Sequence, residues 1–249
     1  MGCDSNGRFT FVKSDIIGDT GAYASVGMKV LERAAGHATG AYHVDAVEVR
    51  SRAVYTNNIP CGAMRGFGVN QINFAVESCV DELCEMGGFD RWQIRYDNAL
   101  TPGGMTSTGQ VLQSGIGIRK TLEAVKDVFQ QSRHAGIACG IKNTGIGNGV
   151  PDTGKVKIVI ESPERILIHQ GWTEMGQGVY TMAVQFFCEV TGLSPEIVEV
   201  RVDTSEESES GMTTASRGTS IIGHSVIDAA TILKQDLEQR SLEELTGKV

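Results

Sequence analysis

The stretch RILIHQGWTEMGQGVYTMAVQFF, residues 165–187, contains a strand pattern, a glycine-rich turn and a helix pattern in succession. Residues 165–170 and residues 155–161 (KVKIVIE) both alternate, so together they predict a β-hairpin. Apolar residues then recur at helical spacing from about residue 178 to 191. A glycine-rich turn before a helix presents backbone N–H groups and the positive end of the helix dipole, which suits an anionic, phosphate-bearing ligand. The same glycines can also serve only to make the turn.

The residues on either side of this stretch predict an α+β arrangement. A helix precedes the hairpin, a strand is expected at 196–203, and a final helix follows it. This order places helices on one side of a mixed sheet. The charged tail, 234–249, is expected to be solvated or frayed. The helical stripes comprise Ile118, Leu122, Val125 and Phe129 before the hairpin, and Ile222, Val226, Ala229, Leu233 and Leu237 in the final helix.

The first part of the chain also mixes strands and helices. The segment TPGGMTSTGQ (101–110) has the composition of a linker. We therefore predict one domain at 1–101 and a second at 102–249, both with mixed sheets and helices packed on one side. The expected elements of the first domain are strands at 8–13 and 47–55 and helices at 27–37, 69–85 and 89–100.

Composition and charge exclude several classes of function. The net charge of -8 argues against a broad surface for nucleic acid or anionic lipid. The six cysteines form no CxxC pair and the five histidines no HxxxH pair, so the spacing indicates no zinc site. There is no GxSxG elbow and no P-loop. Because the chain shows neither a signal-peptide pattern nor an apolar run of about 20 residues, we expect a soluble, cytoplasmic protein without nucleic-acid or membrane partners.

Three further stretches carry groups that can do chemistry. TTASRGTSIIGHSV (213–226) places five hydroxyls and Arg217 before a helix, which suits either an anion or simple helix capping. PCGAMRGFG (60–68) surrounds one arginine with glycines, and its cysteine has no neighbouring base in the sequence. LERAAGH (31–37) carries Arg33, which needs a ligand or, as the alternative, a structural salt bridge.

Three of these motifs, in this order, resemble the molybdenum-binding subunit of the xanthine dehydrogenase and aldehyde oxidase family: GAMRGFGVNQ (62–71), GWTEMGQGVYT (171–181) and TASRGTSIIGHSV (214–226). Residues 18–57 share the resemblance. The family's subunit is much longer, so the resemblance implies that 1–101 is the C-terminal part of a first molybdopterin-binding domain and the rest the N-terminal part of a second. In the family molybdopterin holds molybdenum without a protein ligand, so no metal-ligating residue is expected.

The resemblance implies roles for individual residues. Arg33 matches the arginine that holds substrate in xanthine-type members, Arg65 an arginine near the molybdenum, and Phe67 a phenylalanine of the substrate pocket. Arg33 favours a purine or related N-heterocycle, because a fixed guanidinium stabilises the charge that develops on the ring. The residues that match cofactor-binding positions are Gly66, Met175, Gly176, Gln177, Gly178, Ala215, Ser216, Arg217, Gly218 and Thr219.

Parts of the family's machinery have no counterpart in these residues. The essential glutamate base, which the family carries in a Gly-Glu motif, is missing, and Glu174 and Glu189 stand in no matching motif. We therefore expect a chain that is inactive alone. It would work in an oligomeric assembly with the remaining molybdenum-subunit segments and with iron–sulfur and FAD-bearing subunits or domains, and it would hydroxylate its substrate with water-derived oxygen.

A second class of function stays open at this point. A glycine-rich module can bind a cofactor or a partner without catalysis, and a truncated chain can have lost its affinity for the cofactor. The sequence leaves open which heterocycle or aldehyde is the substrate and whether the molybdopterin carries a cytosine nucleotide.

Overall fold

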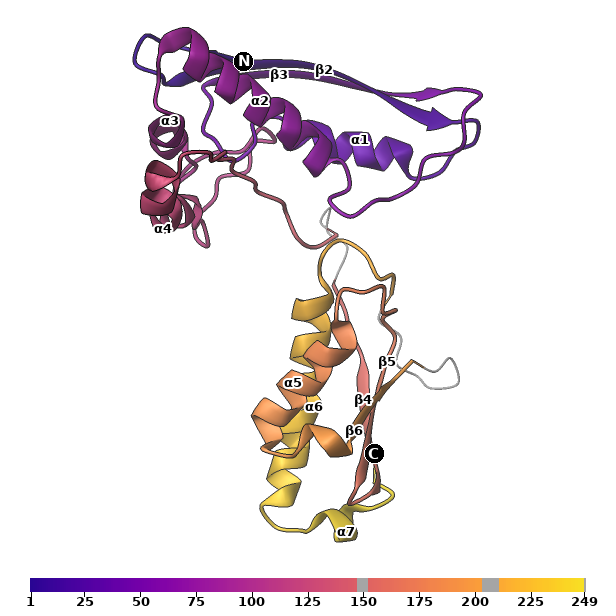
Figure 1. Ribbon diagram of the computed structural model, residues 1–249. Coiled ribbons are helices and arrows are strands. Elements are labelled where there is room, and N and C mark those ends of the chain that lie inside the picture. Colours follow the sequence, from indigo (N-terminus) through magenta and orange to yellow (C-terminus); the bar gives the residue numbers. More distant parts are fainter. Residues whose placement is uncertain (147–151, 203–210, 249) are drawn as a thin grey trace. The chain divides into compact units, whose positions relative to one another are not determined.

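The computed structural model describes residues 1–146, 152–202 and 211–248, which form two compact units, Met1–Lys142 and Asn143–Val249 (Figure 1). The predicted division between residues 101 and 102 falls inside the first unit. There the indole N–H of Trp92 donates to the carbonyl of Leu122 over 2.8 Å and joins segments on both sides of the predicted linker. The division into domains at residue 101 therefore stays a prediction. No helix among the described residues is long and apolar enough to cross a membrane.

The first unit contains a sheet in the order β1-β2-β3, in which β2 runs antiparallel to β1 and parallel to β3. The strand predicted at 8–13 continues to Gly21, although Asp and Gly disfavour strands, because β3 pairs with it along its length. The elements are β1 (Gly2–Cys3), β2 (Phe9–Gly21), α1 (Gly27–Ala35), β3 (Ala46–Tyr55), α2 (Val69–Gly87), α3 (Arg91–Asn98) and α4 (Ile118–Gln131).

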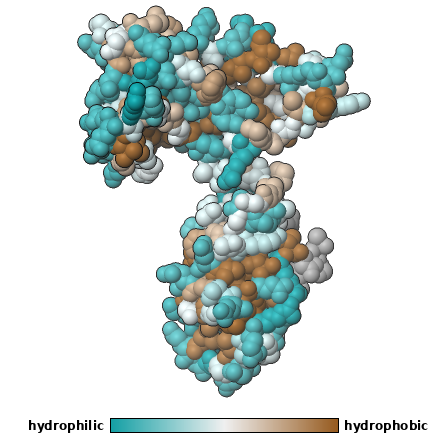
Figure 2. Space-filling model, viewed as in Figure 1, coloured by the Kyte–Doolittle hydropathy of each residue, from teal (hydrophilic) through white to brown (hydrophobic). Residues whose placement is uncertain are grey.

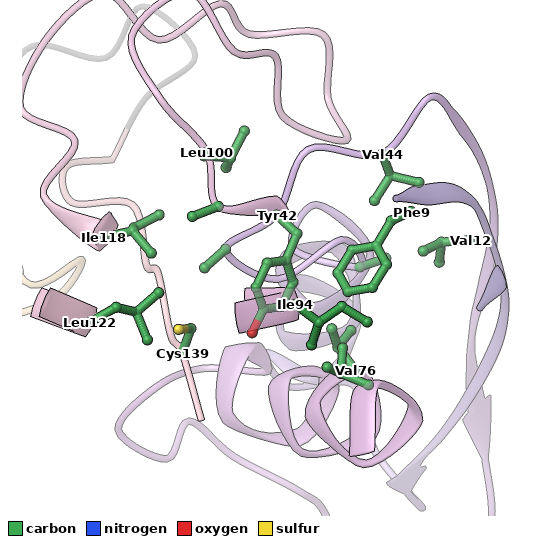
Figure 3. Packing of buried hydrophobic residues seen from close by; sticks show 14 of the residues in the cluster. Phe9, Val12, Tyr42, Val44, Val76, Ile94, Leu100, Ile118, Leu122 and Cys139 are labelled. Carbon is green, nitrogen blue, oxygen red and sulfur yellow. The ribbon is translucent and has the colours of Figure 1, made fainter. Parts of the chain in front are cut away.

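The core of the first unit lies between the sheet and the helices. Figure 3 shows Phe9 of β2 and Val76 of α2 around Tyr42. The rings of Phe9 and Tyr42 meet edge to face, with centroids 5.3 Å apart, which is a favourable aromatic geometry. The helical stripe predicted for 69–85 is confirmed, since Ile72, Val76 and Val80 are all buried.

A charged network is buried in the same unit. Arg95 of α3 is fully buried, and its Nε donates to Glu77 Oε2 over 2.8 Å. Its Nη2 donates to Asp81 Oδ1 over 2.8 Å, and the hydroxyl of Tyr42 donates to Glu77 Oε1 over 2.5 Å. Burial would lower the pKa of Arg95, but the neighbouring carboxylates of Glu77 and Asp81 raise it above its usual value. The network joins α2, α3 and the segment of Tyr42.

The second unit is a three-stranded sheet in the order β4-β5-β6, with α5 and α6 on one face (Figure 1). The predicted hairpin is confirmed, because β4 and β5 pair antiparallel, and β5 continues through α5 into the parallel β6. Both units therefore have the predicted α+β class with mixed strands. The elements are β4 (Val156–Ser162), β5 (Arg165–Gln170), α5 (Val179–Thr191), the short 3-10 helix η1 (Pro195–Ile197), β6 (Val198–Arg201), α6 (Gly218–Leu237) and α7 (Leu242–Leu245).

The charged tail is largely exposed, as expected for a solvated segment, but it is not frayed, because it continues α6 and then forms α7. Ser241 and Glu244 form a capping box at the start of α7, and Leu245 is fully buried in the core. The amide of Gly247 donates to the carbonyl of Ile160 over 2.8 Å, which ties the tail to the outer edge of β4. The charged residues of this segment therefore flank Leu245, which is buried in the core of the second unit.

Candidate functional site

The turn between β5 and α5 depends on two glycines with left-handed backbone. Gly176 has φ of 91° and Gly178 has φ of 79°. A Cβ at either position would meet nothing within 4 Å, so the glycines are required by conformation and not by crowding. The backbone of this turn therefore lies next to open space, where another molecule can approach it closely.

The carboxylate of Glu174 caps the start of α5. Glu174 Oε1 accepts from the amides of Gly176 (2.7 Å) and Gly178 (3.0 Å), and Oε2 accepts from the amide of Tyr180 (3.4 Å). These backbone hydrogen bonds, that of Gly178 first, lower the pKa of Glu174, so the group is a weak base. The backbone amides that were expected to bind an anionic ligand thus donate to the carboxylate of Glu174 instead.

The side chain of Gln177 bridges the same turn. Its Oε1 accepts from the amide of Met175 over 2.5 Å, and its Nε2 donates to the carbonyl of Thr173 over 2.8 Å. Gln177 thereby fixes the backbone between residues 173 and 178. Met175 stays 68% exposed at the tip of the turn.

The second loop, residues 211–218, contains strained backbone. Ala215 and Ser216 are consecutive non-glycine residues with positive φ, 62° and 53°. Left-handed backbone costs energy for residues with a Cβ, and such strain clusters at ligand clamps and active sites. The strain at Ala215 and Ser216 is the strongest backbone sign of a functional loop in this unit.

The buried side chain of Arg217 holds this loop in place through hydrogen bonds. Arg217 is 4% exposed, its Nη1 donates to Asp152 Oδ1 over 2.9 Å, and its Nη2 donates to the carbonyl of Met212 over 2.9 Å. Its guanidinium lies over the Trp172 ring, 5.1 Å from the centroid. The Nε of Arg217 is buried and has no partner among the described residues. One donor of this side chain is therefore available to a further acceptor.

The two loops contact each other. The amide of Thr173 donates to Thr213 Oγ1 over 3.0 Å. A Cβ at Gly218 would lie 3.1 Å from the Trp172 ring, so the start of α6 packs against the first loop. Trp172 is held in turn by the side-chain amide of Gln170, which bonds its N–H (2.6 Å) and its carbonyl (2.8 Å). The fold thus brings together the predicted residues 175–178 and 215–219.

The first unit positions the remaining predicted residues. Phe67 has φ of 52° and stands between Gly66 (98°) and Gly68 (95°), so three successive residues are left-handed. A Cβ at Gly68 would lie 2.1 Å from the carbonyl oxygen of Val30, so this loop lies directly against α1, the helix of Arg33. The loop of Arg65 and Phe67 and the helix of Arg33 are therefore neighbours.

Arg33 interacts electrostatically with the basic groups of His37 and Lys142 and with the carboxylate of Glu32. No carboxylate in the described part of the chain forms an ion pair with Arg33, although a structural salt bridge was the alternative interpretation. Burial lowers the pKa of Lys142, and the charge of Arg33 lowers it further. Burial also lowers the pKa of His37. The hydrogen bond between its ring and the carbonyl of Arg33 opposes this shift, while the charges of Arg33 and Lys142 lower the pKa further. The positive charge of Arg33 thus lowers the pKa of both neighbours, and a guanidinium without an ion-pair partner among the described residues suits a negatively charged or polarised ligand.

Sequence reasoning missed several residues that hold these loops. Thr173, Thr213, Gln170 and Asp152 make their contacts across long stretches of chain or within a turn, and no spacing in the sequence pairs them. The hydroxyl run of 213–226 was the one signal that included Thr213.

Two other features of the surface do not coincide with the predicted residues. One hollow is lined by Val184, Gln185, Cys188, Glu189 and Pro195, and another lies between Asn6 and Asn98, and neither includes a predicted site residue. No group of three or more His, Cys, Asp or Glu side chains that could hold a metal ion occurs in the described ranges.

Comparison with known families gives two matches, which together cover most of the chain. Residues 1–99 and residues 112–246 each match a family model described as a molybdopterin cofactor-binding domain. The two matched segments lie on either side of residues 100–111, which include the predicted linker.

Curated relatives and solved structures agree with these matches. The chain is 30% identical over 253 residues to a subunit of a probable xanthine dehydrogenase of Bacillus subtilis, covering 97% of this chain and 34% of the relative. It is 42% identical over 126 residues to the nicotinate dehydrogenase large molybdopterin subunit of Eubacterium barkeri, covering 51% of this chain and 30% of the relative. The aldehyde oxidoreductase of Desulfovibrio desulfuricans shares the fold, with a TM-score of 0.78 at 24% identity over 92% of this chain and 27% of that chain. The chain thus spans about a third of the length of these relatives.

Proposed function

Because the chain belongs to the molybdopterin-binding subunits of the xanthine dehydrogenase family, we propose that it forms part of a molybdenum hydroxylase. The reaction would hydroxylate a purine or a related N-heterocycle with oxygen derived from water. One observation carries the assignment of the cofactor site: the strained loop of Ala215 and Ser216 is bonded to the glycine-rich turn before α5 through Thr213 and Thr173.

The residues of these two loops fit a ligand with phosphate and pterin groups. Gly176 and Gly178 leave open space beside the backbone, and the buried Nε of Arg217 lacks an acceptor among the described residues. Met175, Gln177, Gly178 and residues 215–219 would hold the molybdopterin through backbone and side-chain polar groups. When bound, the cofactor would supply the redox chemistry of the reaction. An anionic group at the start of α5 would compete with the carboxylate of Glu174 for the same amides.

The residues of the first unit would serve the substrate. Arg33 would bind the heterocycle and stabilise negative charge on it, since no carboxylate in the described part of the chain forms an ion pair with its guanidinium. Arg65, Gly66 and Phe67 lie in one loop beside α1. Arg65 and Gly66 would face the cofactor there, and Phe67 would line the substrate pocket. The relatives support a nitrogen heterocycle, because xanthine and nicotinate, named in two of them, are both N-heterocycles.

The proposed enzyme needs polypeptide beyond these residues. The glutamate base implied by the family resemblance has no counterpart in the chain, and Glu174 is held as a weak base by its amide donors. We therefore expect no hydroxylation by the chain alone. Iron–sulfur and FAD-bearing partners would carry electrons away. The cytosine dinucleotide form of the cofactor is compatible with the proposal but not required by it.

Analysis of the assembled complex tests this function. The chain should be purified with its partners from a molybdenum-replete host, and both molybdenum and the fluorescent oxidised pterin should be measured per protein. We expect both groups together with hydroxylation of xanthine or nicotinate, and no turnover by the isolated chain. A complex without pterin and molybdenum would instead indicate a non-catalytic binding module, in which Glu174 permanently occupies the start of α5.

A further inference from the structure

The strands β2 and β3 form a long parallel ribbon with a free edge. Their register runs from Phe11 opposite Ala46 to Gly21 opposite Tyr55. In the part of the chain that the structure describes, no strand pairs with the other edge of β3. Figure 1 shows β2 and β3 side by side as a ribbon that extends beyond its helices.

Such an edge is unusual for a finished sheet. An unpaired strand presents a row of N–H and C=O groups that can pair with another chain, and natural edges are blunted by short length, proline or lysine. Residues 46–55, AVEVRSRAVY, contain neither proline nor lysine. Charged side chains also blunt edges, but of the three in this segment Glu48 and Arg52 pair with charges of β2, which leaves Arg50. Parallel strands are also found mainly inside larger sheets, and a two-stranded ribbon is marginal by itself.

The helices leave this edge accessible. The hydroxyl of Ser51 donates to the carbonyl of Leu31 over 3.2 Å, and Gly18 of β2 also lies against the Leu31 side chain, so α1 covers one face. The opposite face carries cross-strand ion pairs, Lys13 with Glu48 (3.3 Å) and Asp15 with Arg52 (3.1 Å). A new strand can therefore join beside β3 without displacing α1.

We propose that an extended segment of molybdenum-subunit polypeptide outside these 249 residues pairs as a β-strand with the free edge of β3. The expectation that a strand pairs here rests on the unpaired edge of β3 alone. Only the identity of the partner rests on the proposed function. The surface is thus a site of strand addition, in which backbone hydrogen bonds provide affinity and alternate side chains provide specificity.

The length of the relatives and the charge of the edge support this occupant. The matched region makes up 34% of the length of the Bacillus subtilis relative, so most of that subunit is further polypeptide. Arg50 is exposed on the face of the ion pairs and forms none itself with the residues that the structure describes. We expect the added strand to place an Asp or Glu opposite Arg50. Figure 2 shows apolar residues at the surface of this unit among polar ones, and Ile17 (62%) and Val54 (42%) on the ribbon are exposed.

A second copy of the chain fits this edge less well. Two copies related by a twofold axis perpendicular to the sheet must pair residues that face the same side. The two registers of longest overlap pair 46–54 with itself or 47–55 with itself, and they place Arg50 opposite Arg50 or Arg52 of the second copy. The first register also places Glu48 opposite Arg52, but these two side chains already pair with Lys13 and Asp15 within the chain, whereas Arg50 meets an arginine in both registers. Like charges directly opposite each other destabilise a strand pair.

Hydrogen exchange tests the pairing on the chain in its complex. The tagged chain is isolated with its partners from the organism that encodes it and compared with the 249-residue chain alone by mass spectrometry. We expect amide exchange across residues 46–55 to slow at least about tenfold in the complex, while exchange in α4 stays the same. Equal exchange of residues 46–55 in both samples would overturn the proposal. Slow exchange of residues 46–55 in the chain alone, together with the mass of a dimer, would also overturn the proposal and would indicate that a second copy occupies the edge.

Cross-linking identifies the occupant, and a charge reversal tests its side chains. A photoreactive p-benzoyl-phenylalanine in place of Arg50 should cross-link to a peptide of molybdopterin-binding polypeptide, and the same group in place of the exposed Lys120 on α4 should not. A cross-link only to another class of protein, or none, would exclude the proposed occupant. Arg50→Glu should lower the recovered partner at least about threefold, and Lys120→Glu should not. A protected edge in a complex that lacks pterin would refute the proposed function and leave the strand addition standing.

Discussion

The amide of Thr173 donates a hydrogen bond to the hydroxyl oxygen of Thr213, 40 residues later, over 3.0 Å. This bond ties the glycine-rich turn before α5 to the strained loop before α6. Neither loop alone distinguishes a cofactor site from an ordinary helix start, since glycines make turns and hydroxyl residues cap helices. Their direct contact, with Ala215 and Ser216 in left-handed backbone beside it, is the observation on which the proposed shared ligand rests.

Gln177→Ala should lower cofactor retention in the assembled enzyme. The side chain of Gln177 bonds both Thr173 and Met175, so its loss removes two hydrogen bonds that shape the turn. We expect roughly a five- to tenfold decrease in pterin per protein after gel filtration. Gln185→Ala, on the exposed side of the following helix, is the matched control and should retain its pterin. Unchanged pterin content in Gln177→Ala would remove this residue from the cofactor site.

Arg33→Met should reduce turnover of the heterocycle far more than cofactor content. A fixed guanidinium that stabilises charge in the transition state contributes about a hundredfold or more to the rate. The measurement is kcat for xanthine or nicotinate in the assembled enzyme, normalised to pterin. Lys29→Met removes an exposed cation from the same helix and serves as the control. If the Arg33 and Lys29 variants turn over equally, Arg33 has no role toward the substrate.

Ala215→Gly should stabilise the protein. Ala215 has φ of 62°, a conformation that glycine adopts without strain, so the substitution should raise the free energy of unfolding by about 1 kcal/mol. Denaturant titration measures the change. Ala229→Gly, inside α6, should lower the same free energy by about 1 kcal/mol, because glycine is unfavourable in a helix. A loss of stability in both variants would mean that the backbone at residue 215 is not strained.

Glu77→Gln should destabilise the first unit strongly. The carboxylate of Glu77 faces the buried guanidinium of Arg95, and neutralising it leaves a buried charge without one of its partners. The expected loss is about 3–5 kcal/mol in the free energy of unfolding. Glu85→Gln on the same helix breaks only an exposed pair with Arg91 and should cost about 1 kcal/mol or less. Similar melting temperatures for the two variants would contradict a structural role of the buried network.

The stability of the chain should depend on His37 in mildly acidic solution. Burial lowers the pKa of His37 in the folded chain, so the unfolded chain binds the proton more tightly. The free energy of unfolding should therefore fall as the pH drops from about 6.5, the ordinary histidine pKa, toward the pKa of His37 in the folded chain. Above about pH 6.5, His37 should add no pH dependence to the stability. His37→Gln should flatten the slope in denaturant titrations between pH 7.5 and about 5, with His134→Gln as the exposed control. An unchanged slope in His37→Gln would assign the pH dependence to other groups.

The periodicity of the sequence predicted most helices and strands, but it did not predict where β2 ends or how the C-terminal segment packs. The hairpin of β4 and β5, the helix α2 and the helices on one side of a mixed sheet all follow from local patterns that repeat within a few residues. The extension of β2 to Gly21 did not follow, because Asp19 and Gly21 become strand residues only when β3 pairs with them. The anchoring of the tail through Leu245 did not follow either, since the core that buries Leu245 is made by distant segments.

The sequence by itself determined the two loops, their glycines and hydroxyls, and the family to which they belong, because these features are local and occur in a fixed order along the chain. Only the tertiary structure decided that Thr173 meets Thr213, that Arg217 is buried over Trp172, and that Glu174 occupies the start of α5. Each of these contacts requires a particular backbone path or the approach of segments far apart in the chain. Local residue spacing does not encode such an approach, so packing of the whole unit decides it.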